Sequence, residues 1–378
     1  MHRIDVNFGT PELDLAGQWA ALSGRSAGNV FMDPIALRVV CSTHFANMHV
    51  LLAWLRDAQA PRLVGLWALQ DVRVAPLGPA FLATPPYNYA FLSNPVIDPD
   101  FMDDAAAAFL DAIDQNPHLP KLLRLRCLDA SSDSYAAIVK SLVARNARIV
   151  ELGERQRAFV TREFGVKRSG STRKKLRHNW HRLCTLGQVE VVNDRSESAA
   201  RDAFEVYLAM EAASWKGARG TALLCNVADA AFARQLIAAL AAERSASVAL
   251  LKVNGRAIAA QVLLYGGAMA YTWKTAFDSG YGKFSPGALL VDRLTEQLFA
   301  TDGIDAIESC SPNGGFMAQI WDGRRATVDL VADLGCGNSS LRFNALANGE
   351  RVLARLRHVR NTLHAVGEEA MRRRRAWL

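Results

Sequence analysis

Runs of apolar residues in the second half of the chain predict three strands joined by tight turns. The runs cover residues 248–253, 257–265 and 269–277, and the middle one is almost wholly apolar, which indicates burial on both faces of a sheet. Asn254-Gly255 separates the first two runs and favours a type I′ hairpin turn, because both of its positions require a positive φ. We therefore expect a three-stranded meander here.

Helical signals surround this meander. Ser285-Pro286-Gly287 predicts a helix that begins there and ends near residue 300, with serine as the N-cap and proline in the first turn. Two further helices are predicted over 198–213 and 229–243, and a strand over 304–308. The order of elements in this half is therefore two helices, three strands, one helix and one strand.

The first half has a similar but weaker order of elements. The same patterns predict strands and helices in the following order: strands 50–55, 62–68 and 89–97, helix 103–113, strand 122–127, helix 135–145 and a strand near 148–152. We predict an α/β (α+β) chain of two related units, with mixed, mostly antiparallel sheets flanked by helices. The expected boundaries are 1–160, a basic linker helix at 161–187, a second unit at 188–345 and a basic tail at 346–378.

Composition limits the class of protein. The 378 residues are 50% hydrophobic and 21% charged, which suits a packed protein of two or three domains and argues against disorder. We find no uncharged apolar run of about 18 residues, and Met1–Asp5 lacks an apolar leader. We therefore expect a cytoplasmic protein, with attachment to the surface of the inner membrane as an alternative.

Cysteine and histidine spacing does not predict a metal site. The six cysteines are scattered without a CxxC pair, so we expect them to be reduced and mostly buried. His178 and His181 are one helical turn apart, but they lie in a basic run without an acidic or thiol partner. No metal is expected.

Positive charge is concentrated in two segments. The net charge is +7, yet residues 155–182 hold ten Lys/Arg and one acid, residues 351–378 hold eight Arg and two Glu, and the remainder sums to −8. A nucleic-acid partner is therefore not expected. The exposed cations of 167–182 either form a solvated helix face or contact an anion, such as a cofactor phosphate, an anionic lipid or a charged polymer. Arg372–Arg375 is expected to be a frayed tail.

Each unit has a predicted helix that follows its first three strands, and only one of these two helices begins with residues that suit a phosphate. The free amides at a helix N-terminus can hold an anion. In the second unit this start is Lys283-Phe284-Ser285-Pro286-Gly287, with a cation and a glycine, whereas in the first unit it is Asp98-Pro99-Asp100, whose carboxylates repel phosphate. Only the second unit is predicted to bind a nucleotide-like cofactor, and no dinucleotide or P-loop motif follows a strand.

Several segments of the second half resemble the CelD/BcsL-like acyltransferases of cellulose and exopolysaccharide biosynthesis, a GNAT-type family. The resemblance rests on Glu211–Gly217, Tyr271–Asp278, Tyr281, Ser285–Gly287 and the basic stretch Ser171–Leu183. It covers about residues 165–300 and implies two tandem GNAT-like units, the second of them catalytic. It further implies an acetyl-CoA or other acyl-CoA donor and an amine or hydroxyl acceptor on a sugar or lipid-linked saccharide. Related tandem-GNAT proteins include the Fem-type aminoacyl transferases.

The sequence departs from this family after the last strand. An aspartate is usual there, followed by an aromatic-lysine pair, but this chain has Ser309-Cys310-Ser311 and then Phe316-Met317. Trp321 has a counterpart in the family, and the resemblance makes it a substrate-binding residue. The acceptor end of the site therefore differs from the family pattern.

Glu211 is the predicted general base. It shares a helix face with Phe204, Tyr207 and Leu208, so burial is expected to raise its pKa, which suits proton removal from an attacking amine or hydroxyl. The alternative is a structural ion pair with Lys216 or Lys274. Lys216 itself is a candidate for an anionic substrate group.

Aromatic residues and a second lysine complete the predicted substrate site. Trp215 is expected in the core or in a pocket wall, and Lys274 is expected to pair with Asp278 at the end of its strand, facing a ligand. A strand amide near Trp273 is expected to polarise the acyl carbonyl.

The cofactor residues follow from the same comparison. Tyr281 is the candidate acid for the departing thiolate, although packing is an equal alternative. Lys283, Ser285, Gly287 and Ala288 are the candidate cofactor-binding residues, and the amides of Gly287 and Ala288 are expected to contact the pyrophosphate.

Three functions remain open at this point. The first is an acyl-CoA-dependent N- or O-acyltransferase acting on a saccharide of an envelope polymer. The second is a Fem-type transferase that takes its aminoacyl group from tRNA, and the third is a non-catalytic binding protein of the same fold. The acidic balance outside the two basic segments counts against a broad tRNA surface.

Overall fold

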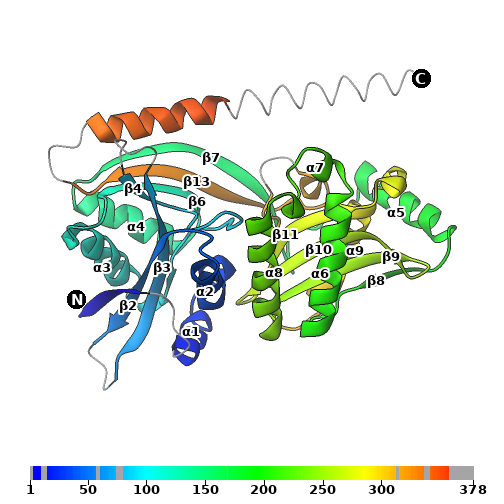
Figure 1. Cartoon of the computed structure of the whole chain (residues 1–378), viewed down its shortest axis with the longest axis horizontal. Helices are drawn as coiled ribbons and strands as arrows, with labels where there is room; N and C mark the ends of the chain where they lie inside the picture. The colour runs from blue at the N-terminus through cyan, green and yellow to red at the C-terminus, as the bar shows by residue number, and fades with distance from the viewer. Residues whose placement is uncertain are drawn as a thin grey trace.

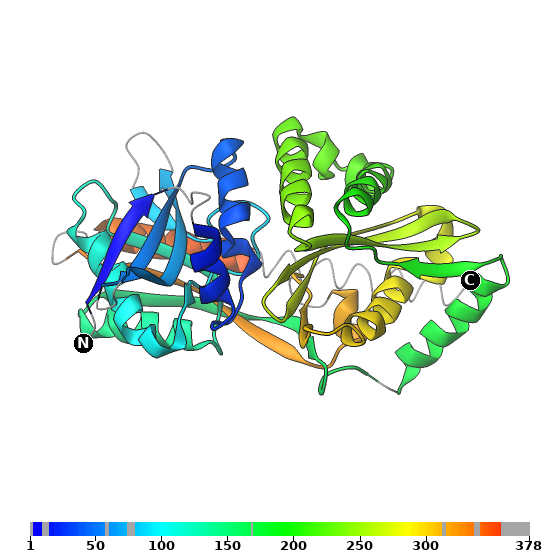
Figure 2. The same ribbon diagram turned by 90° about the horizontal axis from the view of Figure 1, so that it is seen from below.

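Two α/β units lie side by side and share one continuous sheet (Figure 1). A computed structural model describes residues 3–9, 15–56, 60–73, 80–167, 169–311, 315–335 and 341–356. Figure 2 shows the long strands β7 and β13 crossing from one unit to the other. The sheet order is β1-β2-β3-β4-β6-β13-β7-β12-β11-β10-β9-β8, with β5 added beside β3.

The first unit is built from a mixed sheet with helices against it. Its elements are β1 (Ile4–Gly9), α1 (Ala16–Ser23), η2 (Val30–Met32), α2 (Pro34–Ser42), β2 (Met48–Leu55), β3 (Arg62–Arg73), β4 (Ala80–Ala83), β5 (Val96–Ile97), η3 (Pro99–Phe101), α3 (Met102–Gln115), β6 (Leu122–Asp129), α4 (Asp133–Ala144) and β7 (Arg148–Thr161). The strands predicted near 50, 62, 122 and 148 and the helices predicted near 103 and 135 are confirmed. The expected strand over 89–97 is wrong, since only Val96–Ile97 is extended and paired.

The second unit follows the predicted order. Its elements are α5 (Ser171–Cys184), β8 (Val189–Val192), α6 (Glu197–Ala212), α7 (Trp215–Ala218), η4 (Leu223–Cys225), α8 (Val227–Ala242), β9 (Ala246–Val253), β10 (Arg256–Gly266), β11 (Met269–Phe277), η5 (Ser279–Phe284), α9 (Pro286–Phe299), β12 (Ala306–Glu308), η6 (Phe316–Gln319) and β13 (Arg324–Asp333). Among the strand pairs, β4–β6 and β11–β12 are parallel and the others are antiparallel, so the predicted mixed sheet is confirmed.

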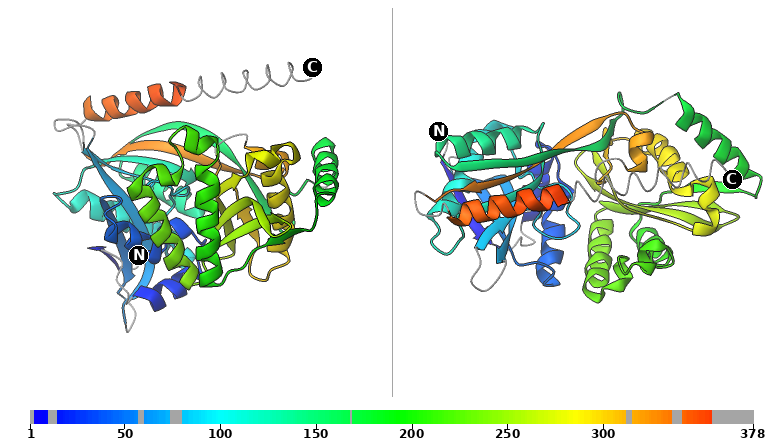
Figure 3. Two further views of the ribbon diagram at one scale, coloured as in Figure 1. Left: turned by 45° about the vertical axis from the view of Figure 1, so that its right-hand side comes forward. Right: turned by 90° about the horizontal axis from the view of Figure 1, so that it is seen from above.

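Strand β13 leaves the second unit and enters the sheet of the first. It pairs with β7 from Arg324 to Asp333 and, on its other side, with β6 from Thr327 to Asp333. The range 188–345, predicted for the second unit, therefore includes a strand whose hydrogen bonds belong to the first. Residues 341–356 form a further helix, which also packs on the first unit (Figure 3).

Local turn chemistry explains the central meander. Asn254 and Gly255 have φ values of 50° and 79°, as a type I′ turn requires, and they connect β9 to β10. Ser285 does precede α9, but its backbone is left-handed (φ 55°, ψ 54°) and its side chain caps no helix amide. The predicted capping role of Ser285 is therefore wrong.

The basic helix α5 packs against the outer face of the second unit. Leu176 and Leu183 are buried, Trp180 is half-buried beneath the Arg293 guanidinium, and the Arg173 side chain pairs with Asp292 of α9. Figure 3 shows α5 at the far end of this unit. The predicted apolar stripe is confirmed. The remaining cations of the helix, including Lys174, Lys175 and Arg177, are exposed.

One hydrophobic core runs across the junction of the two units. It contains Phe31 from the first unit and Phe232 and Tyr271 from the second, and the half-buried Phe45 of the first unit stacks on Phe232. The junction is close-packed at backbone level, because a Cβ on Gly28 would lie 2.7 Å from the Gly266 carbonyl oxygen. Tyr271 Oη also donates to the Gly28 carbonyl at 2.9 Å. The relative placement of the units is therefore fixed by direct packing.

The structure tests the predictions about buried cysteines and about membrane-spanning segments. Of the five cysteines in the described residues, only Cys310 is buried, while Cys184 and Cys225 are exposed, so the prediction of mostly buried cysteines is wrong. Within the described ranges, no single helix is long and apolar enough to cross a membrane. Residues 215–225 and α8 reach that threshold only together, across a bend of 69°.

Candidate functional site

A β-bulge marks the centre of the second unit. The register of β10 and β11 passes from Val262–Lys274 to Leu263–Thr272, so Trp273 has no opposite residue. A bulge brings two consecutive side chains toward one face and frees part of the backbone ladder. Trp273 joins the core formed with α6 and α8, and the Lys274 ammonium lies 5.4 Å from its ring centroid.

Tyr89 of the first unit completes this centre. Its carbonyl accepts the Trp273 indole N–H at 2.8 Å, and its hydroxyl donates to Asp229 of α8. Its backbone is left-handed (φ 75°), a conformation that a bulky residue adopts only when its surroundings hold it there. Tyr89 lies in the segment predicted as a strand, and neither Tyr89 nor Asp229 carries a signal in the sequence for these roles, because the roles depend on a contact between units.

Lys274 is a cation without a carboxylate partner. Its ammonium lies 4.2 Å from the centroid of the Tyr89 ring, and among the described residues it makes no hydrogen bond or ion pair. Burial lowers the pKa of Lys274 from its ordinary 10.5 to about 8, although the charges of Glu211 and Asp229 act in the opposite direction. The predicted pair with Asp278 is wrong, because Asp278 pairs with Arg256 at 2.8 Å and caps Gly280.

Glu211 is held in a closed set of hydrogen bonds. Its Oε1 accepts from Tyr207 at 2.6 Å and from Lys216 at 2.9 Å, and its Oε2 accepts from the Leu223 amide at 2.9 Å. Burial alone would raise the pKa of Glu211, but Lys216 and these donors hold it below its ordinary value. The expected raised pKa is therefore wrong, and the geometry matches the alternative of an ion pair with Lys216.

Lys216 serves the same arrangement. Besides Glu211, its ammonium donates to the carbonyl of Thr275 on β11 at 3.0 Å. It therefore ties the end of α6 to the strand that carries the bulge. Both acceptors are part of the protein, so the Lys216 ammonium is already engaged.

The two predicted tryptophans lie in opposite surroundings. Trp215 is 57% exposed, with the Arg219 guanidinium 5.1 Å from its ring centroid, so it is not a core residue, and its place in a pocket wall stays a prediction. Trp321 is fully buried between the strands and α9, where its indole donates to Thr295 Oγ1 at 3.2 Å. A side chain with no exposed surface cannot contact a substrate, so Trp321 is a core residue.

The N-terminus of α9 combines several features of an anion site. Two cations lie against the ring of Phe284. The Lys283 ammonium of η5 is 5.1 Å from the ring centroid, and the Arg182 guanidinium of the basic helix α5 is 5.3 Å from it. Gly287 lies at the second helical position, and a Cβ there would have only ordinary contacts, the nearest at 3.6 Å from Thr275. The Ala288 amide, in contrast, donates to the Ser285 carbonyl at 3.0 Å and is already used.

Strand β12 ends at Glu308, whereas β11 continues beside this helix. They pair over three positions only, ending at Tyr271–Glu308, and β11 then continues for six residues without β12. Thr272 Oγ1 bridges the start of the gap to the Glu308 carbonyl, and Met317 of η6 lies 3.3 Å from the same hydroxyl. Tyr281 of η5 is half-buried, and its ring centroid lies 6.3 Å from that of Phe284.

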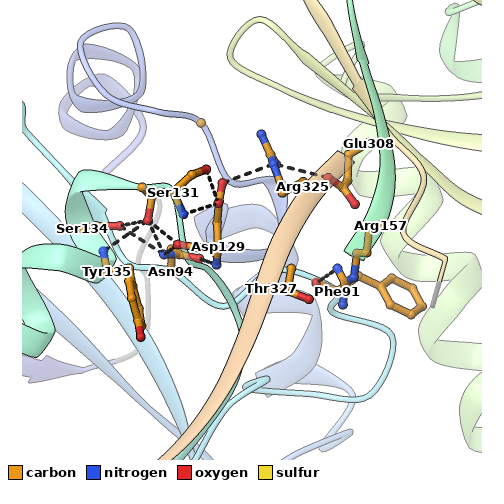
Figure 4. Close-up of polar contacts among 12 residues, drawn as sticks. Phe91, Asn94, Asp129, Ser131, Ser134, Tyr135, Arg157, Glu308, Arg325 and Thr327 are labelled. Carbon is orange, nitrogen blue, oxygen red and sulfur yellow. Dashed lines mark hydrogen bonds and ion pairs between the residues drawn. The ribbon is translucent and has the colours of Figure 1, made fainter. Parts of the chain in front are cut away.

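A buried ionic cluster lies where β7 and β13 cross between the units (Figure 4). Arg325 pairs with Asp129 at 3.2 Å and with Glu308 at 3.4 Å, and Arg157 donates to the Phe91 carbonyl. Burial raises the pKa of Glu308, although Arg325 and Arg157 oppose this. Glu308 immediately precedes the Ser309-Cys310-Ser311 departure, and its buried carboxylate is joined through Arg325 to Asp129 of the first unit.

A cavity of about 430 Å³ opens on another side of the junction. Trp19, Asp33 and Arg38 of the first unit and Arg195 and Tyr265 of the second are among its lining residues. It contains none of the residues that the sequence predicted for the site. In the part of the chain that the structure describes, no group of three or more His, Cys, Asp or Glu could hold a metal ion.

Comparisons with known proteins assign a domain to the second unit. Residues 170–313 match the family model of the acetyltransferase (GNAT) domain, so the chain contains a GNAT domain. No curated protein matches the sequence. The narrower resemblance to CelD/BcsL-like enzymes stays a prediction.

Solved structures share the two-unit fold at low sequence identity. FemX is 10% identical with a TM-score of 0.59, covering 85% of this chain and 96% of its own. The C-terminal DUF2156 domain of a protein described as a lysylphosphatidylglycerol synthetase from Agrobacterium fabrum is 13% identical with a TM-score of 0.55, covering 88% and 94%. L-PGS from Bacillus licheniformis is 14% identical with a TM-score of 0.50, covering 92% and 97%.

Proposed function

We propose that the protein is an acyl-CoA-dependent acyltransferase that transfers the acyl group to an amine or hydroxyl of a sugar or lipid-linked saccharide. The observation that carries this proposal is the edge of β11 beyond Tyr271, which β12 does not pair, beside the cationic start of α9. Such a strand edge offers backbone groups to a thioester arm, and a helix N-terminus with two cations suits the phosphates of CoA. Acetyl-CoA or a longer acyl-CoA supplies the activated acyl group.

The residues at the helix start fit such a donor. Gly287 brings the start of α9 close to β11, since a Cβ there would already contact Thr275 and Phe277, and Lys283 and Arg182 supply the charge. A backbone amide of the bulge at Trp273 is the proposed donor to the acyl carbonyl, where negative charge develops during attack. Ser285 contributes its backbone turn, and Ala288 is left out because its amide is engaged.

Lys274 replaces Glu211 as the proposed general base. A base must hold a free lone pair near the operating pH, and the lowered pKa of Lys274 makes its neutral amine available there. Among the described residues, the Lys274 side chain has no hydrogen-bond or ion-pair partner that would hold its proton. In the proposed reaction the acceptor oxygen or nitrogen bonds to the acyl carbon while Lys274 takes its proton. The carbon–sulfur bond then breaks, and Tyr281 gives a proton to the departing thiolate.

Thermal unfolding with and without ligand tests the donor. A ligand that binds only the folded state raises the melting temperature. Acetyl-CoA, longer acyl-CoAs and free CoA should each raise the Tm of the wild type and of Gly287→Ala, which fits the space available. Gly287→Asp should abolish the shift, because a carboxylate there repels phosphate. Release of free thiol in the presence of saccharide acceptors then measures turnover.

Two other outcomes would overturn the proposal. An absence of any shift at millimolar CoA, together with salt-dependent binding of aminoacyl-tRNA, would favour a Fem-type transferase. FemX shares the fold, so binding of aminoacyl-tRNA is the alternative to measure beside CoA. CoA binding without turnover on any acceptor would favour a non-catalytic binding protein, for which the Ser309–Ser311 and Phe316-Met317 departures are the motivating observation.

A further inference from the structure

The helix over residues 341–356 is apolar on two opposite sides. One side packs on the first unit through Phe343, Leu346 and Ala347, against a cluster that includes Phe81 and Val331. Glu350 lies on the same buried side, where it pairs with Arg124 and Arg126. This side accounts for the position of the helix.

The other side faces outward and carries large aliphatic side chains. Leu341, Val352 and Leu356 are 83%, 54% and 59% exposed. They lie along one stripe, because 11 residues are about three helical turns and four residues are about one. Leu353 beside them is 45% exposed. Packing on the first unit does not explain this stripe.

The charges beside the stripe have one sign. Arg342, Arg351 and Arg355 are exposed, and the only acidic residue of the helix, Glu350, is buried and paired. An exposed apolar stripe flanked by arginines, with no acid at the surface, is typical of helices that lie in the interface of an anionic bilayer. The anionic headgroups pair with the guanidinium groups while the aliphatic side chains enter the acyl boundary.

A second exposed apolar patch without acidic residues lies on α7 and the start of α8, near the proposed active site around Lys274. Trp215, Leu224 and Val227 are 57%, 40% and 86% exposed, and residues 212–228 contain no Asp or Glu. Arg219 covers the Trp215 ring. Both α7 and the helix over 341–356 lie on the upper side of the molecule in Figure 1 and in the left view of Figure 3.

We propose that these two patches dock the protein on the surface of an anionic lipid bilayer, where it takes an acceptor carried by a lipid. The choice of acceptor rests on the proposed function, whereas the docking itself does not. Lys216 of α7 and Asp229 of α8 contact the same network as Lys274, so docking through α7 and the start of α8 brings that centre close to the headgroups.

Vesicle flotation of the full chain tests the docking. The probes are vesicles of phosphatidylcholine alone and of an equal mixture with phosphatidylglycerol, at low and high salt. We expect binding to the mixed vesicles only, weakened about tenfold by Val352→Ser/Leu356→Ser. Replacing Arg351 and Arg355 with Gln should weaken it about fivefold per residue. Val143→Ser, which removes a 61% exposed valine from α4, is the control and should bind as the wild type does.

Hydrogen exchange provides a second readout. Peptides within 341–356 and 215–228 should gain protection when mixed vesicles are added. Equal binding by Val352→Ser/Leu356→Ser and the wild type, or no gain of protection in 341–356, would overturn the proposal. A dimer that this double variant abolishes, without vesicle binding, would assign the stripe to a second copy of the chain. The CoA-dependent thermal shift should be the same in all variants, so a missing shift would count against the acyltransferase proposal alone.

Discussion

Replacement of Lys274 separates the two roles that a buried lysine can have. If Lys274 is the general base, Lys274→Met should lower kcat by about 10²–10⁴-fold. Lys274→Arg keeps the cation but cannot release a proton near neutral pH, so it should lose activity to a similar extent. In the wild type, kcat/KM should rise about tenfold per pH unit up to about pH 8, where the pKa of Lys274 lies, and then level off.

The same substitution should stabilise the fold. A lysine whose pKa is lower in the folded chain than in the unfolded chain destabilises the fold while it is protonated. The fall in the pKa of Lys274 from 10.5 to about 8 corresponds to a destabilisation on the order of 3 kcal/mol, since one pKa unit is about 1.4 kcal/mol. Loss of the contacts with the Tyr89 and Trp273 rings offsets about 1–2 kcal/mol of this. We therefore expect Lys274→Met to gain about 1–2 kcal/mol at pH 7.

Urea unfolding from pH 7 to pH 10.5 measures the stability difference, and thiol release over the same range measures the activity. The cost of the protonated lysine is fully present below pH 8 and is relieved as the pH approaches 10.5. The advantage of Lys274→Met should therefore disappear over this interval. A variant that is less stable than the wild type at pH 7, or that keeps its activity, would refute the reasoning and make Lys274 a structural cation.

Two further substitutions probe the junction and the carboxylate beside it. Gly28→Ala should lower the free energy of unfolding by about 1–3 kcal/mol, because its Cβ would overlap the Gly266 backbone. The control Gly9→Ala, which has nothing within 4 Å of its Cβ, should change the free energy of unfolding little. Equal effects of the two substitutions in urea unfolding would contradict this. Glu211→Gln should cost about 3 kcal/mol at pH 7, because it leaves Lys216 without its charge partner. Since the pKa of Glu211 is lowered in the fold, its contribution is lost as the pH falls through that pKa, and the gap between variant and wild type should narrow below pH 4.5. A pH-independent gap would exclude the ion pair as the cause.

Local signals in the sequence predicted most elements of the second unit. The Asn254-Gly255 turn and the proline at the start of α9 act through backbone geometry that is set within a few residues, and both elements begin where expected. The apolar run at 89–97 was predicted as a strand, but its burial comes from the junction between units. Tyr89 satisfies its backbone carbonyl with the Trp273 indole instead of a neighbouring strand.

The candidate site depended on contacts that spacing along the chain does not report. Asp278 follows Lys274 by four residues, but the β10–β11 hairpin brings Arg256 to Asp278 and the bulge directs Lys274 toward Tyr89. Trp215 and Trp321 are the same residue type, yet Trp215 is exposed and Trp321 is buried. Tertiary packing decides which of the two reaches solvent, and the local sequence does not report it. Glu211 was correctly expected to be buried, but its three hydrogen-bond donors reverse the expected direction of its pKa.

The position of β13 affects the order in which the chain can fold during synthesis. The strand lies between β6 and β7, and it is made almost two hundred residues after the first of these two strands. Until the ribosome has completed residues 324–333, the sheet of the first unit lacks its central connection and β6 and β7 expose unpaired edges. The second unit, whose meander and helices are close in sequence, can form in this interval. The second unit can therefore become compact before the sheet of the first unit is closed by β13.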